Sequence, residues 1–272
     1  PLTVTARHAV VLAASAVQTP ALLLRSGLTQ GPVGEHFSGH PGVAMAGRFA
    51  EPVRAWEGAT QGHEVIGLRH EGLKFEALGF GIDVLAGRMR GTGSAFGARL
   101  RDLQHYLEWG AAIRAEARGR VQVLGGRTIV RYEPTAGDLA LFRRGLRVLG
   151  ELLFAAGATS VEPGVRGVAE ELTGPGPLAA LEREGPRKPG AFSAALTHMF
   201  GTARIGSDPA TSVVGPGFRH HNLDRLYVAD SSVFPSNTGV NPQVAIMAIA
   251  TLCARHIAGV PVTQAPTTSE TP

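Results

Sequence analysis

Three side chains in the last third of the chain have the chemistry of a catalytic site. His198 lies in a glycine-flanked stretch that predicts a loop, and an imidazole titrates near pH ~6.5, so His198 is a candidate general base. Asp230 follows residues 226–229, which predict a buried parallel strand, and doubly wound folds bind ligands at the ends of such strands. Asn241 and Pro242 predict the N-cap and first residue of a helix, whose free N–H groups attract anions. Spacing alone leaves open whether the three converge, because lone histidines and capping asparagines more often have structural roles.

The ends of the chain predict the elements that would position these residues. Residues 2–14 alternate in polarity and then become continuously apolar, which predicts a strand buried on both faces. Thr19, Pro20 and Gly27 then predict the N-cap, first residue and stop of a helix. The last helix is predicted to run over residues 242–259.

The middle of the chain predicts an antiparallel sheet. Between residues 48 and 86 short segments alternate in polarity, which is typical of strands with one solvated face. Glu64, Glu71 and Glu76 are therefore expected to face solvent, with pocket lining as the alternative. Further strands are predicted at residues 106–115, 120–124 and 128–132, with a Gly125-Gly126 turn between the last two.

One long helix is predicted after these strands. Thr135 and Asp138 match a capping box, with Asp in place of the usual Glu, and apolar residues over 139–153 recur at helical spacing. Gly157 predicts the end of the helix, and Arg143 is expected on its solvated side. Irregular segments are predicted at residues 28–47 and 160–190.

The composition is that of a folded protein without a nucleic-acid-binding surface. Hydrophobic residues make up 44% of the chain and charged residues 18%. The net charge is +4, and no basic run with interleaved aromatic residues occurs. Cys253 is the only cysteine, which excludes an intrachain disulfide and predicts a buried thiol. The apolar run at 244–254 is shorter than the ~20 residues that span a bilayer, and no signal peptide is recognisable, so a cytoplasmic location is expected.

Other chemically suggestive residues favour structural roles. His36 and His40 have the spacing of a helical metal site, but Ser-Gly between them and Pro41 after them argue against a helix. Residues 220–221, both histidines, predict a surface turn. Residues 91–97 contain glycines at the wrong spacing for a dinucleotide loop, with no apolar strand before them. No metal site is expected.

Five segments, taken in order, resemble one enzyme family. They are VVLAASAVQTPALLLRSG at 10–27, VG and HP within 33–41, HMFGTARIG at 198–206, DSSVFP at 230–235 and NP at 241–242. Their types and order resemble the C-terminal half of the glucose–methanol–choline (GMC) flavin oxidoreductases, with the middle of the chain only weakly matched. Within the family the pattern most resembles bacterial relatives of the long-chain alcohol oxidases.

The resemblance implies FAD as cofactor and a role for each matching residue. His198 corresponds to the family's catalytic base, which takes the alcohol's hydroxyl proton while the carbinol hydride goes to the flavin. Asn241 occupies the partner position and would orient the hydroxyl. The residues implied to contact FAD are Ala14, Ser15, Asp230, Ser231, Asn241, Pro242 and Gln243. Ser15 departs from the glycine that is usual in the family.

The resemblance also implies an α/β (α+β) fold: the C-terminal part of a Rossmann-like FAD domain with an inserted antiparallel-sheet substrate domain. The expected parts are an FAD-domain part at 1–47, a substrate domain at 48–197, the FAD-domain return at 198–259 and a disordered tail at 260–272. No Gly-x-Gly-x-x-Gly occurs, so a missing N-terminal FAD-binding segment is an expected partner. The expected activity is FAD-dependent oxidation of a hydrophobic primary or secondary alcohol. An inactive or truncated fragment and a GMC-fold lyase without net redox change are the alternatives.

Overall fold

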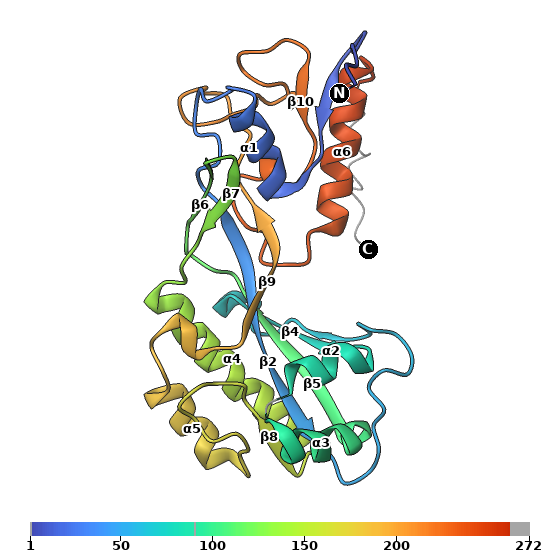
Figure 1. Ribbon diagram of the computed structural model, residues 1–272, viewed down its shortest axis with the longest axis vertical. Coiled ribbons are helices and arrows are strands. Elements are labelled where there is room, and N and C mark those ends of the chain that lie inside the picture. The colour runs from blue at the N-terminus through green and yellow to red at the C-terminus, as the bar shows by residue number, and fades with distance from the viewer. Residues whose placement is uncertain (1, 90, 262–272) are drawn as a thin grey trace, which may run out of the picture.

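The chain folds into two connected parts. A computed structural model describes residues 2–89 and 91–261. In Figure 1 one part holds the first and last helices beside a short pair of strands, and the other holds the large sheet with the longest helix. Most of the predicted tail, residues 262–272, lies outside the described residues.

The larger part is built on an antiparallel sheet, as predicted. Its six strands run in the order β3-β4-β5-β2-β8, and β9 pairs with β2 as well. The strands are β2 (Ser38–Arg48), β3 (Glu64–Val65), β4 (Leu73–Leu78), β5 (Tyr106–Ile113), β8 (Ser160–Glu162) and β9 (Ala194–Phe200). β2 corrects the prediction that residues 28–47 are irregular. Its glycines pack where side chains would clash, since a Cβ at Gly42 would lie 3.1 Å from the Ala111 carbonyl oxygen, and they hide the apolar alternation of a strand.

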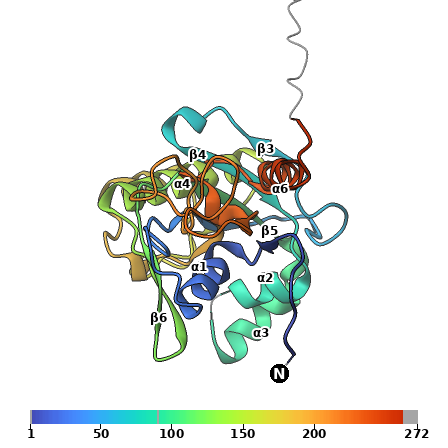
Figure 2. The ribbon, with the colours of Figure 1, turned by 90° about the horizontal axis from the view of Figure 1, so that it is seen from above.

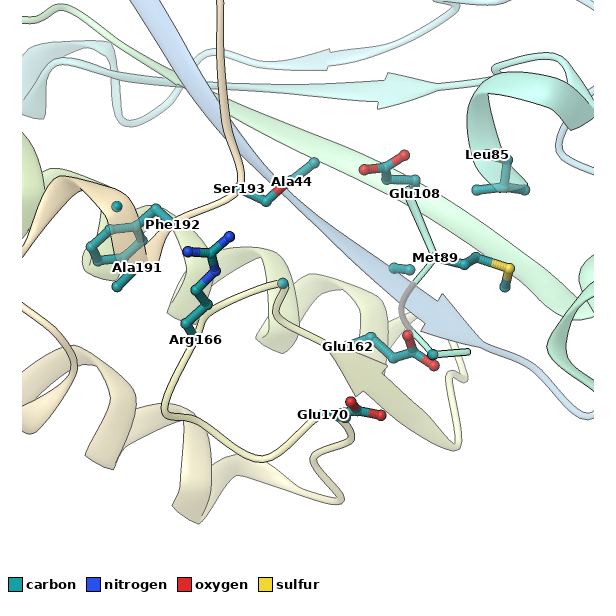
Figure 3. Close-up of a pocket in the computed structure, with 14 residues that line it drawn as sticks. Ala44, Leu85, Met89, Glu108, Glu162, Arg166, Glu170, Ala191, Phe192 and Ser193 are labelled. Atoms are coloured by element: carbon teal, nitrogen blue, oxygen red, sulfur yellow. The ribbon is translucent and has the colours of Figure 1, made fainter. Parts of the chain in front are cut away.

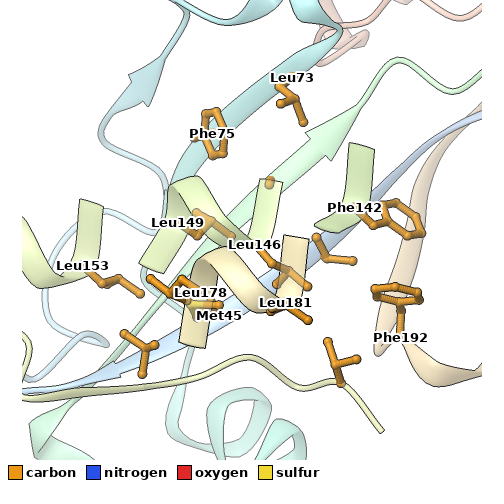
Figure 4. Close-up of a cluster of buried hydrophobic side chains, with 14 of the residues drawn as sticks. Met45, Leu73, Phe75, Phe142, Leu146, Leu149, Leu153, Leu178, Leu181 and Phe192 are labelled. Carbon is orange, nitrogen blue, oxygen red and sulfur yellow. The ribbon is translucent and has the colours of Figure 1, made fainter. Parts of the chain in front are cut away.

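The hydrophobic core lies between one face of this sheet and α4 (Ala136–Ala155). The predicted capping box is confirmed, because Thr135 Oγ1 accepts from the Asp138 N–H at 3.1 Å and Asp138 Oδ2 accepts from the Thr135 N–H at 2.9 Å. The leucines of α4 point into the sheet in Figure 4. The fully buried apolar residues of this core include Met45, Ile113, Leu146, Leu149, Leu153, Val161 and Leu178.

Helix α5 (Pro175–Glu184) covers the side of α4 that was expected to face solvent. Arg143 is therefore buried, and its guanidinium donates to the Glu182 and Pro186 carbonyl oxygens at 3.1 and 3.2 Å. With β8, this helix also corrects the prediction that residues 160–190 are wholly irregular. A proline at its start and few apolar residues gave this short helix little sequence signal.

The smaller part is organised around a two-stranded parallel sheet. β1 (Val10–Leu12) pairs with β10 (Leu226–Val228), and α1 (Ser15–Arg25) and α6 (Gln243–Ile257) lie beside them. The predicted strand at β1 is confirmed, but it is not buried on both faces, because Val10 and Val11 are 47% and 46% exposed. Figures 1 and 2 show α6 at the edge of the molecule.

The remaining elements surround these two parts. The hairpin predicted at Gly125-Gly126 is confirmed, with both glycines at positive φ. His220, expected on the surface, is buried, because its backbone N–H bonds to Leu226 at the end of β10. The elements not yet named are α2 (Ile82–Arg88), α3 (Gly93–Arg101), β6 (Arg120–Leu124) and β7 (Arg127–Arg131). Among the described helices, none combines the length and apolar character needed to cross a bilayer.

Candidate active site

Two histidines meet where β2 and β9 pair. The register sets His40 opposite His198, with an irregularity between His40 and Pro41. Cross-strand neighbours share a face of the sheet, and the two Nδ1 atoms lie 3.0 Å apart with the rings stacked at 5.3 Å. His198 thus lies within β9 rather than in the predicted loop, because the chain continues its pairing with β2 through this residue.

Both imidazoles are held neutral by their surroundings. Burial, then electrostatic interaction with the His198 ring and with Lys74, lower the pKa of His40 to about 4, against smaller opposing effects of Glu76 and the Gly239 backbone. Burial also lowers the pKa of His198, with Lys74 acting in the same direction and Glu76 raising it. Two neutral rings can share one proton between their Nδ1 atoms, so one ring donates and the other accepts. This arrangement leaves His198 Nε2 as the ring nitrogen that does not face His40.

Asn241 joins this cluster through β4. Its Oδ1 accepts from Lys74 Nζ at 2.7 Å, and its Nδ2 donates to Glu76 Oε1 at 2.7 Å. Asn241 does not cap the last helix as predicted, because α6 starts at Gln243, with Pro242 in the N-cap position and no side-chain cap bond. The Asn241 amide points instead towards the two charged groups on the sheet.

Asp230 closes the turn between β1 and α1. Its Oδ2 accepts from the Ser15 N–H at 3.1 Å and from Thr19 Oγ1 at 2.5 Å, while Oδ1 accepts from the Ser232 N–H at 2.8 Å. Thr19 is not the N-cap as predicted, because α1 starts four residues earlier, at Ser15, and the Thr19 hydroxyl bonds to Asp230 from inside the helix. The backbone of Ser15 has φ +82°, a left-handed conformation that favours glycine.

The predicted cofactor residues fall into two groups. Ala14 and Ser15 stand at the start of α1, with Asp230 and Ser231 packed against them. Asn241, Pro242 and Gln243 stand at the start of α6. The start of α6 has no side-chain cap and no acidic residue in its first turn, so it offers backbone N–H groups to an anionic ligand. At the start of α1 the Ser15 N–H already donates to Asp230 and the Val17 N–H to Ser15 Oγ. Thr202, just after β9, donates to the Ala16 carbonyl oxygen at 2.7 Å, which ties the first group to the strand that carries His198.

Three residues of the cluster were not assigned to it from the sequence. His40 was considered as part of a metal pair with His36 and lay in a matched segment, but it was given no role, and Glu76 was expected to face solvent, with pocket lining as the alternative. No role was predicted for Lys74, whose side chain is 3% exposed. The alternation in LKFEAL that predicts a polar strand face is the one available signal, but it does not distinguish solvent from a site.

A cavity of about 500 Å³ opens further along the sheet (Figure 3). Its floor includes Ala44 and Ala46 of β2, on the same face as His40 by strand alternation. Ala44 lies four residues along β2 from His40, which corresponds to about 13 Å along the strand. Glu108, Glu162 and Arg166 line the cavity, but neither histidine of the cluster does. The cavity is therefore separate from the histidine cluster.

Comparison with known proteins places these observations in a family. Two sequence models described as GMC oxidoreductase match residues 115–250 and 2–42. An uncharacterized GMC-type oxidoreductase of Mycobacterium tuberculosis is 35% identical over 89% of this chain and 38% of its own length. A long-chain-alcohol oxidase of Arabidopsis thaliana is 28% identical over 88% of this chain and 35% of its own.

Solved structures support the same placement. Pyridoxine 4-oxidase from Mesorbium loti superimposes with a TM-score of 0.67 at 20% identity, over 93% of this chain and 52% of its own. This likeness confirms the predicted mixed fold of a part of an FAD domain with an antiparallel sheet. The chain spans between about a third and a half of the length of the relatives it matches.

Proposed function

The chain belongs to the GMC oxidoreductase family, and on this basis we propose that it forms the catalytic half of an FAD-dependent enzyme that oxidises an alcohol. FAD is the cofactor of this family. The observation that carries the proposal is the pair of neutral imidazoles, His40 and His198, with the amide of Asn241 tied to the same face of the sheet. A neutral imidazole that is shielded from water can accept a proton, and an amide can orient a hydroxyl group.

His198 is the proposed general base, acting through Nε2. Its Nδ1 faces His40, so the proton of the substrate hydroxyl goes to the other ring nitrogen. His40 remains neutral at physiological pH, because burial and its neighbours hold its pKa at about 4, and its Nδ1 fixes the orientation and tautomer of the His198 ring. Asn241 orients the hydroxyl group. FAD, when bound, supplies the acceptor for the hydride from the carbinol carbon.

The helix ends described above fit an anionic, flat cofactor. Ala14, Ser15, Asp230 and Ser231 would hold its ribityl and phosphate side, and the start of α6 would face its ring. Each helix end contributes about 0.3–2 kcal/mol towards a nearby negative charge, so these residues tune the cofactor and do not drive the reaction. The uncapped start of α6 and the position of Asp230 beside the turn into α1 are the features that support this fit.

The exposed surface of the smaller part supports the proposed partner, an N-terminal FAD-binding segment. β1 has a neighbour on one side only, among the described strands, and its Val10 and Val11 are about half exposed. Parallel sheets are normally covered on both faces. We propose that the FAD domain comprises residues 1–47 and 198–259 together with this segment, and that residues 48–197 form the substrate domain. The β1–β10 pairing joins the two FAD-domain pieces, and β2, from Ser38, connects them to the sheet.

The proposed substrate is a hydrophobic primary or secondary alcohol. The similarity to a long-chain-alcohol oxidase supports this class. In the full-length, FAD-loaded enzyme, an anaerobic panel of alcohols would identify the substrates that bleach the flavin absorbance. A lyase would convert its substrate without bleaching, and an inactive fragment would do neither.

Replacement of the proposed base is the decisive test. In the full-length enzyme, His198→Ala is expected to slow alcohol-dependent flavin reduction by about 10²–10⁴-fold, as for loss of a general base, while FAD content is unchanged. His70→Ala, in an imidazole that is 74% exposed, is the matched control and is expected to keep the normal rate. A normal reduction rate in His198→Ala, measured by stopped-flow absorbance, would remove this residue from the mechanism.

A further inference from the structure

A charged pair on β4 reaches across to the loop that precedes α6. Lys74 Nζ lies 2.5 Å from Glu76 Oε1, and both contact the Asn241 side chain at 2.7 Å. We propose that Lys74 and Glu76 are positioning residues, which hold the Asn241 amide in a single orientation above the sheet. The inference rests on the proposed function of Asn241 in orienting the substrate hydroxyl.

The chemistry of the three groups permits one orientation of the amide. A lysine ammonium can only donate hydrogen bonds, and an ionised carboxylate can only accept them. The Asn241 oxygen must therefore face Lys74 and its nitrogen must face Glu76. The reversed amide would set donor against donor and acceptor against acceptor. The Asn241 nitrogen keeps a second N–H, and the oxygen keeps a second lone pair. Both are available to a substrate hydroxyl in a fixed direction.

The surroundings make this pair rigid. Lys74 is 3% exposed and also contacts Glu64 at 3.0 Å, so its charge is buried and doubly paired. If the two side chains moved apart, each would be left as an uncompensated buried charge. This cost favours the paired geometry. On the neighbouring strand β5, Ala112 lies opposite Lys74 and Gly110 lies opposite Glu76.

The same two charges act on the histidines with opposite signs. Burial lowers the pKa of His198 most, and on top of this Glu76 raises it whereas Lys74 lowers it. The other titratable group that faces His198 is His40 on β2. Because the base must be neutral, activity is lost as pH falls through the pKa of His198. Loss of Lys74 would raise that pKa and move the acid limb of the pH profile to higher pH. Loss of the Glu76 charge would move it to lower pH.

The experiment compares four single variants in the full-length, FAD-loaded enzyme. Lys74→Met and Glu76→Gln break the pair, Lys74→Arg keeps the charge, and Glu64→Gln removes the more exposed partner of Lys74 as the matched control. Flavin reduction by one fixed primary alcohol is followed from pH 5 to 9. Lys74→Met is expected to lower kcat/KM by about 100-fold, as for misplacement of a positioned group. The acid limb should shift upward in Lys74→Met, downward in Glu76→Gln and little in Glu64→Gln.

A double-variant cycle tests whether the pair acts through the amide. If it does, Lys74→Met with Asn241→Ala is about as slow as Asn241→Ala alone. The inference would be overturned if the reductions in kcat/KM caused by Lys74→Met and Asn241→Ala multiplied in the double variant. It would also be overturned if the acid limbs of Lys74→Met and Glu76→Gln moved in the same direction. If Lys74→Met does not fold, Glu76→Gln is compared with Lys74→Arg, and only Glu76→Gln should move the acid limb, to lower pH. Lys74→Arg should keep the limb in place, and a profile shared by these two variants would also overturn it.

The two proposals fail in different ways. If His198→Ala keeps the normal rate, the proposed function fails. If His198→Ala is inactive but Lys74→Met and Glu76→Gln behave like Glu64→Gln, only the positioning role is lost.

Discussion

The two parts of the molecule differ in how completely their apolar helices are covered. In the sheet part, Leu146 and Leu149 of α4 are 0% exposed. In the smaller part, Val244 and Met247 of α6 are 79% and 60% exposed, and Cys253 is the one fully buried residue of that helix. A helix that is apolar on all sides is normally buried. The sheet part therefore buries the apolar face of its long helix, whereas α6 leaves apolar side chains exposed.

The largest effect should come from one matched pair of truncations. In the 272-residue chain, Leu149→Ala should destabilise the fold by about 2–5 kcal/mol, because it leaves a cavity in a closely packed core. Met247→Ala removes a side chain of similar size and should change stability by less than about 0.5 kcal/mol. Urea unfolding followed by circular dichroism measures both. Equal effects would contradict the difference in coverage between α4 and α6.

The second prediction moves the same α6 substitution into the longer protein. If the proposed N-terminal segment covers α6, Met247→Ala in the full-length enzyme should cost about 2 kcal/mol, because the side chain is then buried. Leu149→Ala is the internal reference and should cost the same in both proteins. Thermal unfolding with FAD held at one concentration gives the comparison. An unchanged Met247→Ala effect would mean that the segment docks elsewhere.

Sequence patterns predicted the elements that depend on near neighbours. The capping box of Thr135 and Asp138 and the hairpin at Gly125-Gly126 are local signals, and both are confirmed. β2 was missed because its glycines and alanines have a weak apolar pattern, and its place in the sheet comes from partners more than fifty residues away. Arg143 was assigned to solvent because no local pattern predicts that α5 packs over it.

The residues of the candidate site show the same contrast between local sequence signals and contacts with distant residues. His198, Asp230 and Asn241 were found because they lie in ordered motifs. His40, although it lies in a matched segment, was given no role, and neither were Lys74 and Glu76, because their contacts arise from strand register and from a contact between β4 and the loop before α6. The roles of the predicted site residues remain predictions. A polar residue on an alternating strand has the same sequence signal whether it faces water or a catalytic base.

The third prediction compares two helix starts. Thr135→Ala removes the side-chain oxygen that caps α4 and should cost about 1 kcal/mol. Thr92 is the N-cap residue of α3 but makes no side-chain cap bond, so Thr92→Ala should have little effect. Chemical denaturation of the two variants gives the difference. A similar loss in both would show that backbone preference, and not the cap bond, accounts for the effect at Thr135.

The smallest effect is expected in the turn that precedes α1. Ser15 has φ +82°, where a side chain costs about 1 kcal/mol, and Ser15→Gly keeps the backbone N–H that bonds to Asp230. The greater freedom of glycine in the unfolded chain offsets part of this gain, so a net stabilisation of about 0.5 kcal/mol is expected. Gly27→Ala, at φ +75° in open space, is the control of opposite sign. A stabilisation of several kcal/mol by Ser15→Gly in urea unfolding would mean that local strain, and not the uncovered surface of β1 and α6, limits the smaller part.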